Sequence, residues 1–577
     1  MSSESGALLV SVTLGGEQSL RAEGSRWVFE GALAELRAEE VANGRRFRLE
    51  LTNTARTRRK LAVRFASGRQ LAYVPHLMGI PPVYPLARPM TFAYYGLPSR
   101  VGLPLETAAW EAPLVALLNP GSNQPATTIG CVAGHERGVG LAIEPGAVVF
   151  TFLDGTEKGR STREWLVVEG ANLVDGVRRY QAAQGLWPER PESGLMWYIV
   201  AKSYPAAGSA EARFRADAAE MARLGARCLV IEPFGVGTLH EREFWNPARA
   251  DEEPVVRFLS DAIRICKERG IRPLIYINPF HYTGSAAGSP YAVARFREWQ
   301  YRDAGDWERK RVLNERFPAD YNWFAGEEPE CDADGRIKTS CGWSPSLDPR
   351  CPDLRAWALE FIGYMLERYP GLAGGYVDVW PVTVPAFGKC AAPHAHDYGD
   401  DEWWNATTDF LWDIRAAVKS FPGKEYRVND SRAVPPALAS ADAMVCEDFR
   451  QIRMPGECFW QSLRGRITAG SKPTHMFHHR GEFPHDIKAA LFLACSPVLR
   501  TQYCAFEWHP FDAYPEYVRA LREWCWLLQE EGELEEITIG SESRDIERLV
   551  YVAGGRRVTA DFRAPQAPVV EDGAPRR

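Results

Sequence analysis

The sequence lacks the features that mark membrane and secreted proteins. No apolar run approaches the roughly 18 residues that a membrane-spanning helix needs. The opening stretch MSSESGALLVSVTLGG has no basic segment followed by a long apolar run, so we expect no secretory signal. Positive charge is not in excess either: the net charge is −7, which gives no electrostatic reason to bind nucleic acid or an anionic membrane. We therefore expect a cytoplasmic protein with neither of these partners.

Cysteine pairs at metal-binding spacing are also missing. The 12 cysteines include no C-x-x-C pair, which is the usual core of a structural zinc site. We expect reduced thiols, and Cys228, Cys446 and Cys495 lie in apolar runs typical of core strands. The stretch ECDADGRIKTSCGW (330–343) lacks the full spacing and the distal Glu of a calcium-binding loop. It is interpreted as a turn, and we expect no cofactor.

Alternating strand patterns dominate the first third of the chain. A length of 577 residues predicts two or three domains. Residues 45–66 alternate, turn at Asn53–Thr54 and alternate again, and residues 139–155 repeat the pattern. We predict an N-terminal β-sandwich over 1–188. The Pro-rich stretch LWPERPESG (186–194) is predicted to be a linker.

Short apolar runs then alternate with amphipathic helical segments at 210–225, 255–270 and 353–371. This alternation predicts an α/β fold, a (β/α)8 TIM barrel over 189–530. A doubly wound sheet is less favoured because no Gly-rich phosphate turn follows the first strand. Residues 531–577 are predicted to form a small C-terminal β appendage and, from 564, a disordered tail. The eight candidate strands are 194–204, 227–235, 272–282, 374–382, 425–433, 443–450, 473–481 and 497–505.

The stretch GGYVDVWPV (374–382) places one carboxylate, Asp378, among apolar residues. Desolvating an ionised carboxylate is costly, so its presence needs a reason. In TIM barrels the reacting groups lie at the carboxyl ends of the strands. Glycoside cleavage uses two carboxylates, about 5–5.5 Å apart in retaining enzymes and about 6.5–9.5 Å apart in inverting ones. Asp378 is therefore the candidate nucleophile; the alternative is a structural Asp that caps a turn or pairs with a barrel Arg or Lys.

The second carboxylate has three candidates. Glu447 and Asp448 are neighbours on one strand, so only one of them faces the barrel interior. Glu447 is preferred because it is longer and follows an apolar run, while Asp430 and Asp448 stay open as alternatives. Other polar and aromatic residues near the strand ends suit a sugar, whose hydroxyls need hydrogen bonds and whose C–H faces stack on rings. The substrate-binding candidates are Trp197, Lys202, Glu232, Asn278, His281, Trp380, His394, His396, Asn429, Arg432, Asp448, Arg450, His478, His479, Gln502 and Trp508.

Two histidine clusters favour a second class of function. HMFHHRGEF (475–483) and CAAPHAH (390–396) group side chains that zinc accepts. A metal-dependent hydrolase or lyase is therefore an alternative to a glycosidase. A non-catalytic carbohydrate-binding barrel is a third interpretation, although a binding protein has no need of several carboxylates at strand ends. We expect a carbohydrate substrate, and a homo-oligomer stays open.

The segment SPSLDPRCPDLRAWALEFIGYMLERYPGLAGGYVDVW (344–380) resembles one part of retaining α-glycosidase barrels: a D-P turn, a helix and the strand-4 Asp. It is similar to melibiase-type enzymes, to endo-α-N-acetylgalactosaminidases and to a large bacterial family of glycosidase-like barrels. The resemblance covers residues 195–510 and implies a bacterial glycoside hydrolase in which Asp378 is the nucleophile and Asp430 or Glu447 is the acid/base. Tyr376 differs from the Lys that melibiase-type enzymes have two residues before the nucleophile. The motif of the bacterial family is matched by Cys351–Pro352, Cys390, His394, His396 and Gly399.

Overall fold

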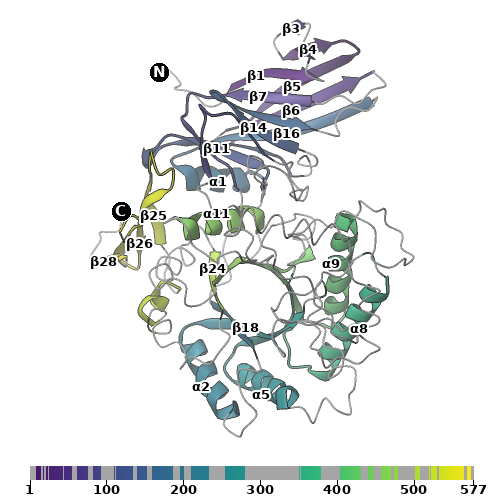
Figure 1. Ribbon diagram of the computed structural model, residues 1–577, viewed down its shortest axis with the longest axis vertical. Helices are drawn as coiled ribbons and strands as arrows, with labels where there is room; N and C mark the ends of the chain where they lie inside the picture. The colour runs from purple at the N-terminus through teal and green to yellow at the C-terminus, as the bar shows by residue number, and fades with distance from the viewer. Residues whose placement is uncertain are drawn as a thin grey trace, which may run out of the picture.

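The N-terminal sheets lie at one end of the computed structural model and a closed barrel lies at the other (Figure 1). Helices α1 (Leu173–Ala182) and α11 (Glu457–Ala469), together with a C-terminal sheet, lie between these two parts. The structure describes residues 8–14, 17–18, 21–23, 25–42, 44–54, 61–75, 82–92, 110, 112–133, 135, 139–152, 159–185, 195–200, 210–232, 254–277, 279, 350, 352–378, 403–429, 440–447, 456–469, 474–478, 501–506, 519, 522–528, 532–564 and 568–572.

Two antiparallel sheets form the N-terminal part, as the alternating pattern predicts. Side chains from both sheets belong to one buried cluster, so the sheets pack face to face. The six-stranded sheet runs β10 (Met90–Thr91), β14 (Val139–Glu144), β15 (Ala147–Phe152), β7 (Leu61–Ala66), β1 (Leu8–Leu14) and β2 (Glu17–Gln18). The nine-stranded sheet runs β3 (Arg21–Glu23), β4 (Arg26–Phe29), β5 (Ala32–Val41), β6 (Gly44–Asn53), β16 (Gly159–Gly170), β13 (Ala126–Cys131), β11 (Leu114–Leu118), β8 (Leu71–Tyr73) and β9 (Val83–Pro85).

The larger sheet is buried on both faces where it meets the rest of the molecule. In β11 every residue is buried: Val115 and Leu117 join the cluster inside the sandwich, whereas Leu114 and Ala116 join the cluster that continues into the barrel. Tyr73 of β8 stacks on Trp460 of α11 with ring centroids 5.2 Å apart. The sandwich therefore shares a continuous apolar core with the barrel.

Eight parallel strands close into a barrel, and each overlaps one of the eight predicted ranges. Five described helices lie between successive strands: α2 (Ala210–Arg223), α5 (Pro254–Glu268), α8 (Pro352–Arg368), α9 (Trp403–Lys419) and α11. A short 3-10 helix, η5 (Cys525–Leu528), follows the last strand. The strands are β17 (Leu195–Val200), β18 (Ala226–Glu232), β19 (Arg272–Ile277), β20 (Gly374–Asp378), β21 (Glu425–Asn429), β22 (Ala443–Glu447), β23 (Thr474–His478) and β24 (Thr501–Phe506).

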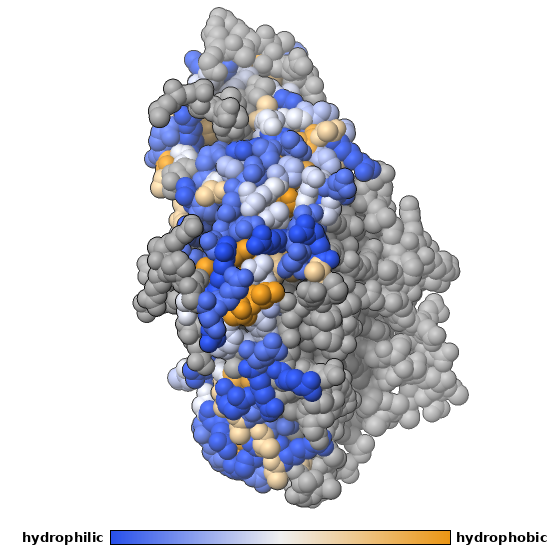
Figure 2. Space-filling model, turned by 90° about the vertical axis from the view of Figure 1, so that its left-hand side faces the viewer, coloured by the Kyte–Doolittle hydropathy of each residue, from blue (hydrophilic) through white to orange (hydrophobic). Residues whose placement is uncertain are grey.

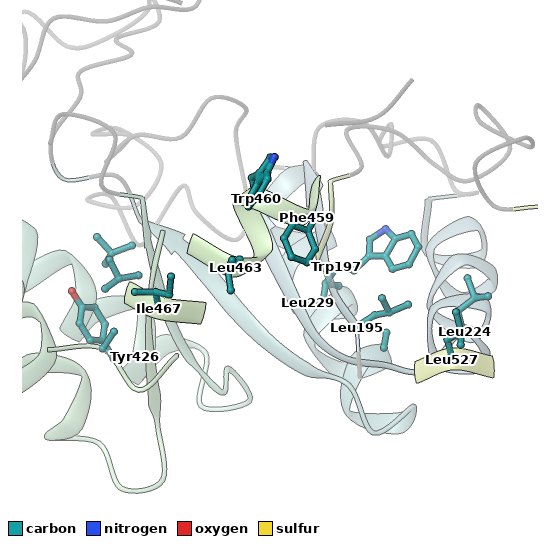
Figure 3. Packing of buried hydrophobic residues seen from close by; sticks show 14 of the residues in the cluster. Leu195, Trp197, Leu224, Leu229, Tyr426, Phe459, Trp460, Leu463, Ile467 and Leu527 are labelled. Carbon is teal, nitrogen blue, oxygen red and sulfur yellow. The ribbon is translucent and has the colours of Figure 1, made fainter. Parts of the chain in front are cut away.

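The barrel strands alternate between two apolar environments. Met196 and Tyr198 of β17 belong to a small cluster in the barrel interior, and Leu195 and Trp197 belong to the larger cluster that includes the helices. Figure 3 shows Leu195 and Trp197 among residues of that outer cluster. This alternation follows from the period of two in a strand. Both faces are apolar because helices cover the outside and side chains fill the inside.

A five-stranded sheet at the C-terminal end ties the molecule together. Its first strand, β12 (Gly121–Ser122), comes from the N-terminal part and pairs with β25. The Asn123 side chain also donates to the Glu535 carbonyl at 2.9 Å. The prediction of a disordered tail from residue 564 is wrong for four residues, because β28 pairs with β27. The other strands are β25 (Gly532–Ile539), β26 (Ile546–Ala553), β27 (Arg556–Asp561) and β28 (Val569–Asp572).

Asp545, between β25 and β26, fastens the C-terminal sheet to α11. Its carboxylate accepts hydrogen bonds from the Gly456 backbone N–H at 3.1 Å and from the Trp460 indole N–H at 2.6 Å. Asp545 is only 3% exposed, and burial raises the pKa of its carboxyl. The contact therefore joins the start of a barrel helix to the end of the chain.

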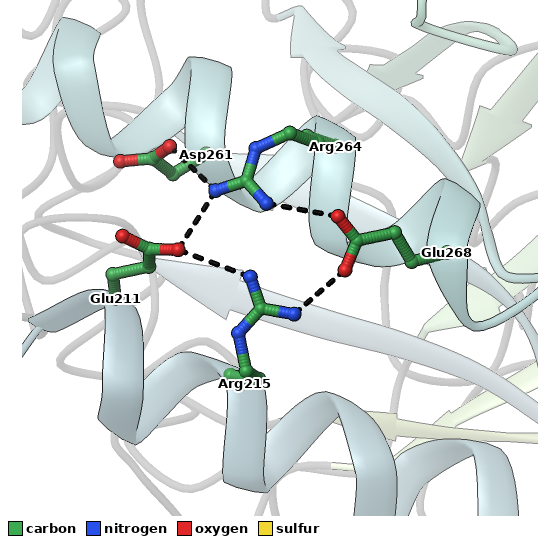
Figure 4. A network of polar contacts seen from close by, with 5 residues as sticks. All are labelled: Glu211, Arg215, Asp261, Arg264 and Glu268. Atoms are coloured by element: carbon green, nitrogen blue, oxygen red, sulfur yellow. Dashed lines mark hydrogen bonds and ion pairs between the residues drawn. The ribbon is translucent and has the colours of Figure 1, made fainter.

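On the outside of the barrel, α2 and α5 are joined by charged side chains (Figure 4). Arg264 contacts Glu211, Asp261 and Glu268 at 2.8–2.9 Å, and Arg215 contacts Glu211 and Glu268 at 3.0 and 2.6 Å. Hydrogen bonds from Arg264 and then Arg215 lower the pKa of Glu211. Because all five side chains are well exposed, water and salt screen the network, which orients the two helices more than it stabilises them.

The coloured surface in Figure 2 is mostly hydrophilic, with small scattered apolar patches. Among the described residues the large apolar side chains that are exposed are Val28, Trp412, Val569 and Val570. None of the described helices is both long and apolar enough to span a membrane.

Candidate active site

Asp378 is the last residue of β20 and lies at the carboxyl end of the barrel strand, as predicted. Tyr376, two residues earlier, belongs to the interior cluster, so Asp378 occupies the interior face of the same strand. The residue is 5% exposed. A carboxylate this deeply buried needs hydrogen-bond donors to replace the water it loses.

Two neighbouring strands supply these donors. The Tyr276 hydroxyl, from β19, donates to Asp378 Oδ2 at 2.6 Å. The Asn429 amide, from β21, donates from Nδ2 to Asp378 Oδ1 at 3.0 Å. Each carboxylate oxygen is thus held from a different side. Hydrogen bonds of this kind favour the charged form of an acid and restrict the rotation of its side chain.

Three tyrosines fill the barrel interior on the side of Asp378. The ring of Tyr198 lies 5.6 Å from that of Tyr276 and 6.4 Å from that of Tyr376, both edge-on. The rings of Tyr276 and Tyr376 are 5.7 Å apart and tilted. Aromatic pairs at these distances pack favourably and leave little freedom to the rings. The tyrosine whose hydroxyl holds Asp378 is therefore itself fixed by two other rings.

Charged residues lie deeper in the barrel, toward the amino ends of the strands. Arg427, which is fully buried, contacts Glu425 Oε2 at 3.1 Å, and Arg272 contacts the same oxygen at 3.1 Å. Arg427 also lies 3.9 Å from the Met196 sulfur. The nearby Cys228 is not a reactive thiol, because burial raises its pKa to about 12. The amino-terminal end of the barrel thus holds an ion cluster of two arginines and one glutamate, in which Arg427 is buried and Arg272 is partly exposed.

The structure brings two of the predicted site residues, Asp378 and Asn429, into direct contact. Four others lie in barrel strands, where the structure describes the backbone alone: Glu232 in β18, Glu447 in β22, His478 in β23 and Gln502 in β24. The remaining candidates lie outside the described residues: Lys202, Asn278, His281, Trp380, His394, His396, Asp430, Arg432, Asp448, Arg450, His479 and Trp508.

Trp197 is a correction. It was predicted to bind substrate, but it is 0% exposed and belongs to the cluster between the barrel wall and the helices. The side chain therefore faces away from the interior, on the opposite face of β17 from Met196 and Tyr198. Its physical role is to fill space behind the strand.

Sequence analysis missed Tyr276. It lies in the run RPLIYINPF, in which Leu274 and Tyr276 share one face of β19. The signal was present in that run, since a tyrosine near the end of an otherwise apolar strand needs a partner for its hydroxyl. The register of β19 with β20, which sets Tyr276 opposite Tyr376, decides that this partner is Asp378.

Among the described residues no cluster of three or more His, Cys, Asp or Glu side chains is arranged to hold a metal ion. Both histidine clusters of the sequence fall on positions whose side chains are not described.

The fold is similar to that of solved α-galactosidases. A variant of the GH36 α-galactosidase AgaA from Geobacillus stearothermophilus, in complex with 1-deoxygalactonojirimycin, matches with a TM-score of 0.53 and 11% identity over 96% of this chain and 78% of that one. AgaB from the same organism matches with a TM-score of 0.50 and 12% identity over 97% and 80%. The α-galactosidase from Lactobacillus brevis matches with a TM-score of 0.50 and 10% identity over 96% and 76%.

At these identities the similarity is one of fold. No protein-family profile matches the sequence, and no curated protein matches it either. The likeness extends over nearly the whole chain, so it covers the N-terminal sheets as well as the barrel.

Proposed function

We propose that this protein is a glycoside hydrolase that cleaves an α-glycosidic bond by a retaining mechanism, with Asp378 as the nucleophile. The observation that carries the proposal is the pair of hydrogen bonds from Tyr276 and Asn429 to the buried Asp378 carboxylate. A carboxylate at the carboxyl end of a barrel strand, with a hydrogen bond to each oxygen, is held in one orientation, as an attacking nucleophile needs to be. The fold shared with α-galactosidases supports the same class of reaction.

In the first step one Asp378 oxygen would attack the anomeric carbon, while a carboxylic acid protonates the leaving glycosidic oxygen. In the second step the same acid, now a carboxylate, would take a proton from water. The water oxygen would attack the anomeric carbon, and the bond between that carbon and Asp378 would break. This releases the sugar and regenerates both carboxyl groups. Tyr276 and Asn429 would keep the carboxylate in its attacking orientation through both steps, because their elements are part of the barrel wall.

Glu447 is the preferred acid/base. Val445 belongs to the interior cluster, and strand alternation puts residue 447 on the same face of β22. Strand β21 separates β20 from β22, so the two backbones are about 10 Å apart. A retaining mechanism requires the carboxyl groups of Asp378 and Glu447 to approach to about 5–5.5 Å. Asp430, which follows Asn429, and Asp448 are the alternatives.

The proposal includes four further features of the protein. These are a (β/α)8 barrel with a helix after each strand, domain limits at 188 and 530, a cytoplasmic location, and hydroxyl-binding roles for the polar candidates at the strand ends. Activity without an added cofactor or metal is part of the same proposal.

The test is a panel of aryl α- and β-glycosides assayed with the wild type and with Asp378→Asn. We expect cleavage of an α-glycoside, its loss in the variant, and rescue by azide to give a β-glycosyl azide. Asp261→Asn, which changes an exposed carboxylate on α5, is the matched control and should be fully active. Full activity of Asp378→Asn would refute the assignment. Activity that appears only with added zinc would favour the metal-dependent alternative.

A further inference from the structure

The ion cluster of Arg272, Glu425 and Arg427 has no place in the mechanism described so far. Both arginines contact the same oxygen of Glu425, each at 3.1 Å. An arginine does not lose its proton under any condition in which the protein is folded. These three side chains, counted by themselves, carry two fixed positive charges and one negative charge, a sum of about +1 while Glu425 is ionised.

The barrel register places this cluster directly beneath the candidate nucleophile. Tyr376 pairs with Arg427, and Asp378 pairs with Asn429, in successive interior positions of β20 and β21. Two residues along a strand span about 7 Å, so the backbones of Arg427 and Asp378 lie one interior position apart, and the two charges are on the order of 10 Å from each other. The space around them is filled by Tyr276, Tyr376 and other interior residues. Little water separates the charges, so their interaction is weakly screened.

The remaining described groups that face the interior carry no charge near neutral pH. They are the side chains of Met196, Tyr198, Cys228, Val230, Leu274, Tyr276, Tyr376, Asn429 and Val445. The other charged or titratable residues proposed for this end of the barrel are Glu447, at the end of β22, and Lys202, Glu232, His281, His394, His396, Asp430, Arg432, Asp448, Arg450, His478 and His479. His475 of β23 pairs with the interior residue Val445 and is a further one. Of these, Glu447 is the proposed acid/base. It would govern the alkaline limb of activity, whereas Asp378 would govern the acid limb.

We propose that Arg427, supported by Arg272 and opposed by Glu425, is a positioning residue whose buried positive charge keeps Asp378 ionised and so sets the acid limit of activity. The inference rests on the proposed function. It goes further because it gives the ion cluster at the amino-terminal end of the barrel a role in the reaction. A purely structural ion cluster would have no such role. A structural cluster would affect stability alone and would leave the pH profile of the folded enzyme unchanged.

The experiment compares the pH dependence of kcat/KM in the wild type, Arg427→Met, Arg272→Met and Glu425→Gln. One charge at about 10 Å and an effective dielectric constant of about 20 moves a titration by about one pH unit. Removing either arginine should move the acid limb to higher pH, by about one unit for Arg427 and less for the more distant Arg272. Removing Glu425 should move it to lower pH. Arg427→Lys, which keeps the charge, should stay near the wild type.

Opposite shifts from the arginine and glutamate variants would support the proposal. The proposal would be overturned if the acid limb of kcat/KM lay at the wild-type pH in all folded variants. It would also be overturned if the limb moved in the same direction whichever charge was removed. If Arg427→Met does not fold, Arg272→Met decides the question, because that side chain is 41% exposed and less constrained by packing.

A second readout separates this inference from the proposed function. The difference in unfolding free energy between the wild type and Asp378→Asn is measured from pH 3 to pH 8, in the Arg272→Met background and without it. The midpoint of that pH dependence should move upward when the arginine is removed. This result needs no substrate, so an absence of glycosidase activity would refute the proposed function and still leave the charge effect tested.

Discussion

Gly374, the first residue of β20, marks the closest approach between two barrel strands. A Cβ atom at this position would lie 1.8 Å from the Glu425 carbonyl oxygen and 2.7 Å from the Glu425 nitrogen. Both are backbone atoms of β21, paired with Gly374 in the register of the barrel. They are not free to rotate away as a side chain would, so we expect Gly374→Ala to force the two strands apart.

The magnitude follows from the distance that must be gained. The separation between the Cβ atom and the oxygen has to grow from 1.8 Å to at least 3.0 Å. This increase is about a quarter of the spacing between neighbouring strands, which is about 4.8 Å. Overpacking of this kind costs about 1–3 kcal/mol, and a weakened strand hydrogen bond adds about 1 kcal/mol. We expect Gly374→Ala to lose about 3 kcal/mol of unfolding free energy.

Urea unfolding followed by tryptophan fluorescence measures this loss, with Gly363→Ala as the matched control. Gly363 lies in α8 and a Cβ there meets nothing within 4 Å, so the control should gain about 0.5–1 kcal/mol from its better helix propensity. The strand shift would also separate Asp378 from Asn429, four residues further along each strand, and lower activity. A Gly374→Ala protein within 1 kcal/mol of the wild type would refute the close approach.

Three further predictions concern other parts of the molecule. Tyr276→Phe keeps the ring and removes the hydrogen bond to Asp378; a bond to a charged group contributes about 1.5–3 kcal/mol, so kcat/KM should fall about 10–100-fold with KM little changed. An unchanged kcat would contradict the orienting role. Asp545→Ala leaves the buried Trp460 indole N–H without its acceptor and should cost about 2–4 kcal/mol in urea unfolding, whereas Asp545→Asn, which keeps an oxygen acceptor, should cost less. Hydrogen bonds from Arg223 and then Arg522 lower the pKa of Glu220 from 4.5 to about 2, so its small contribution to stability is present above pH 4.5 and is lost as the pH falls toward 2. Glu220→Gln should therefore be less stable than the wild type at pH 6 and equally stable near pH 2; a constant difference would contradict the ion pair.

The strands of the barrel could be predicted because each is an apolar run bounded by turn or helix signals. The position of Asp378 could be predicted for the same reason, since a carboxylate after GGYV is tolerated only where the strand ends. The described strand β20 covers Gly374–Asp378 of the predicted strand 374–382, and residues 379–382 lie outside the described residues.

The face of each strand could not be predicted where both faces are apolar. In LMWYIV every residue favours burial, so the sequence does not say whether Met196 or Trp197 faces the interior. The register with neighbouring strands decides it, and this placed Trp197 outside. The hydrogen bond between Tyr276 and Asp378 could not be predicted for a different reason: 102 residues separate the two positions, and only the register of the barrel strands brings them together.

The strand β28 shows a different limit. Its residues, Val569–Asp572, are all exposed and lie in a stretch rich in Pro and Ala. They carry no buried face for a pattern to reveal. They form a strand because the edge of β27 offers unpaired backbone groups, and backbone hydrogen bonds need no particular side chain.

The pairing of β12 with β25 has a consequence for how the chain assembles during synthesis. Residues 121–122 are synthesised long before residues 532–539. Asn123 and its hydrogen-bond partner Glu535 are 412 positions apart in the sequence. The strands of the sandwich are made early, yet β12, which belongs to the C-terminal sheet, has no pairing partner until the entire barrel has been made. A chain that ends within the barrel would therefore keep the strands of the sandwich and lack β25, the strand that pairs with β12.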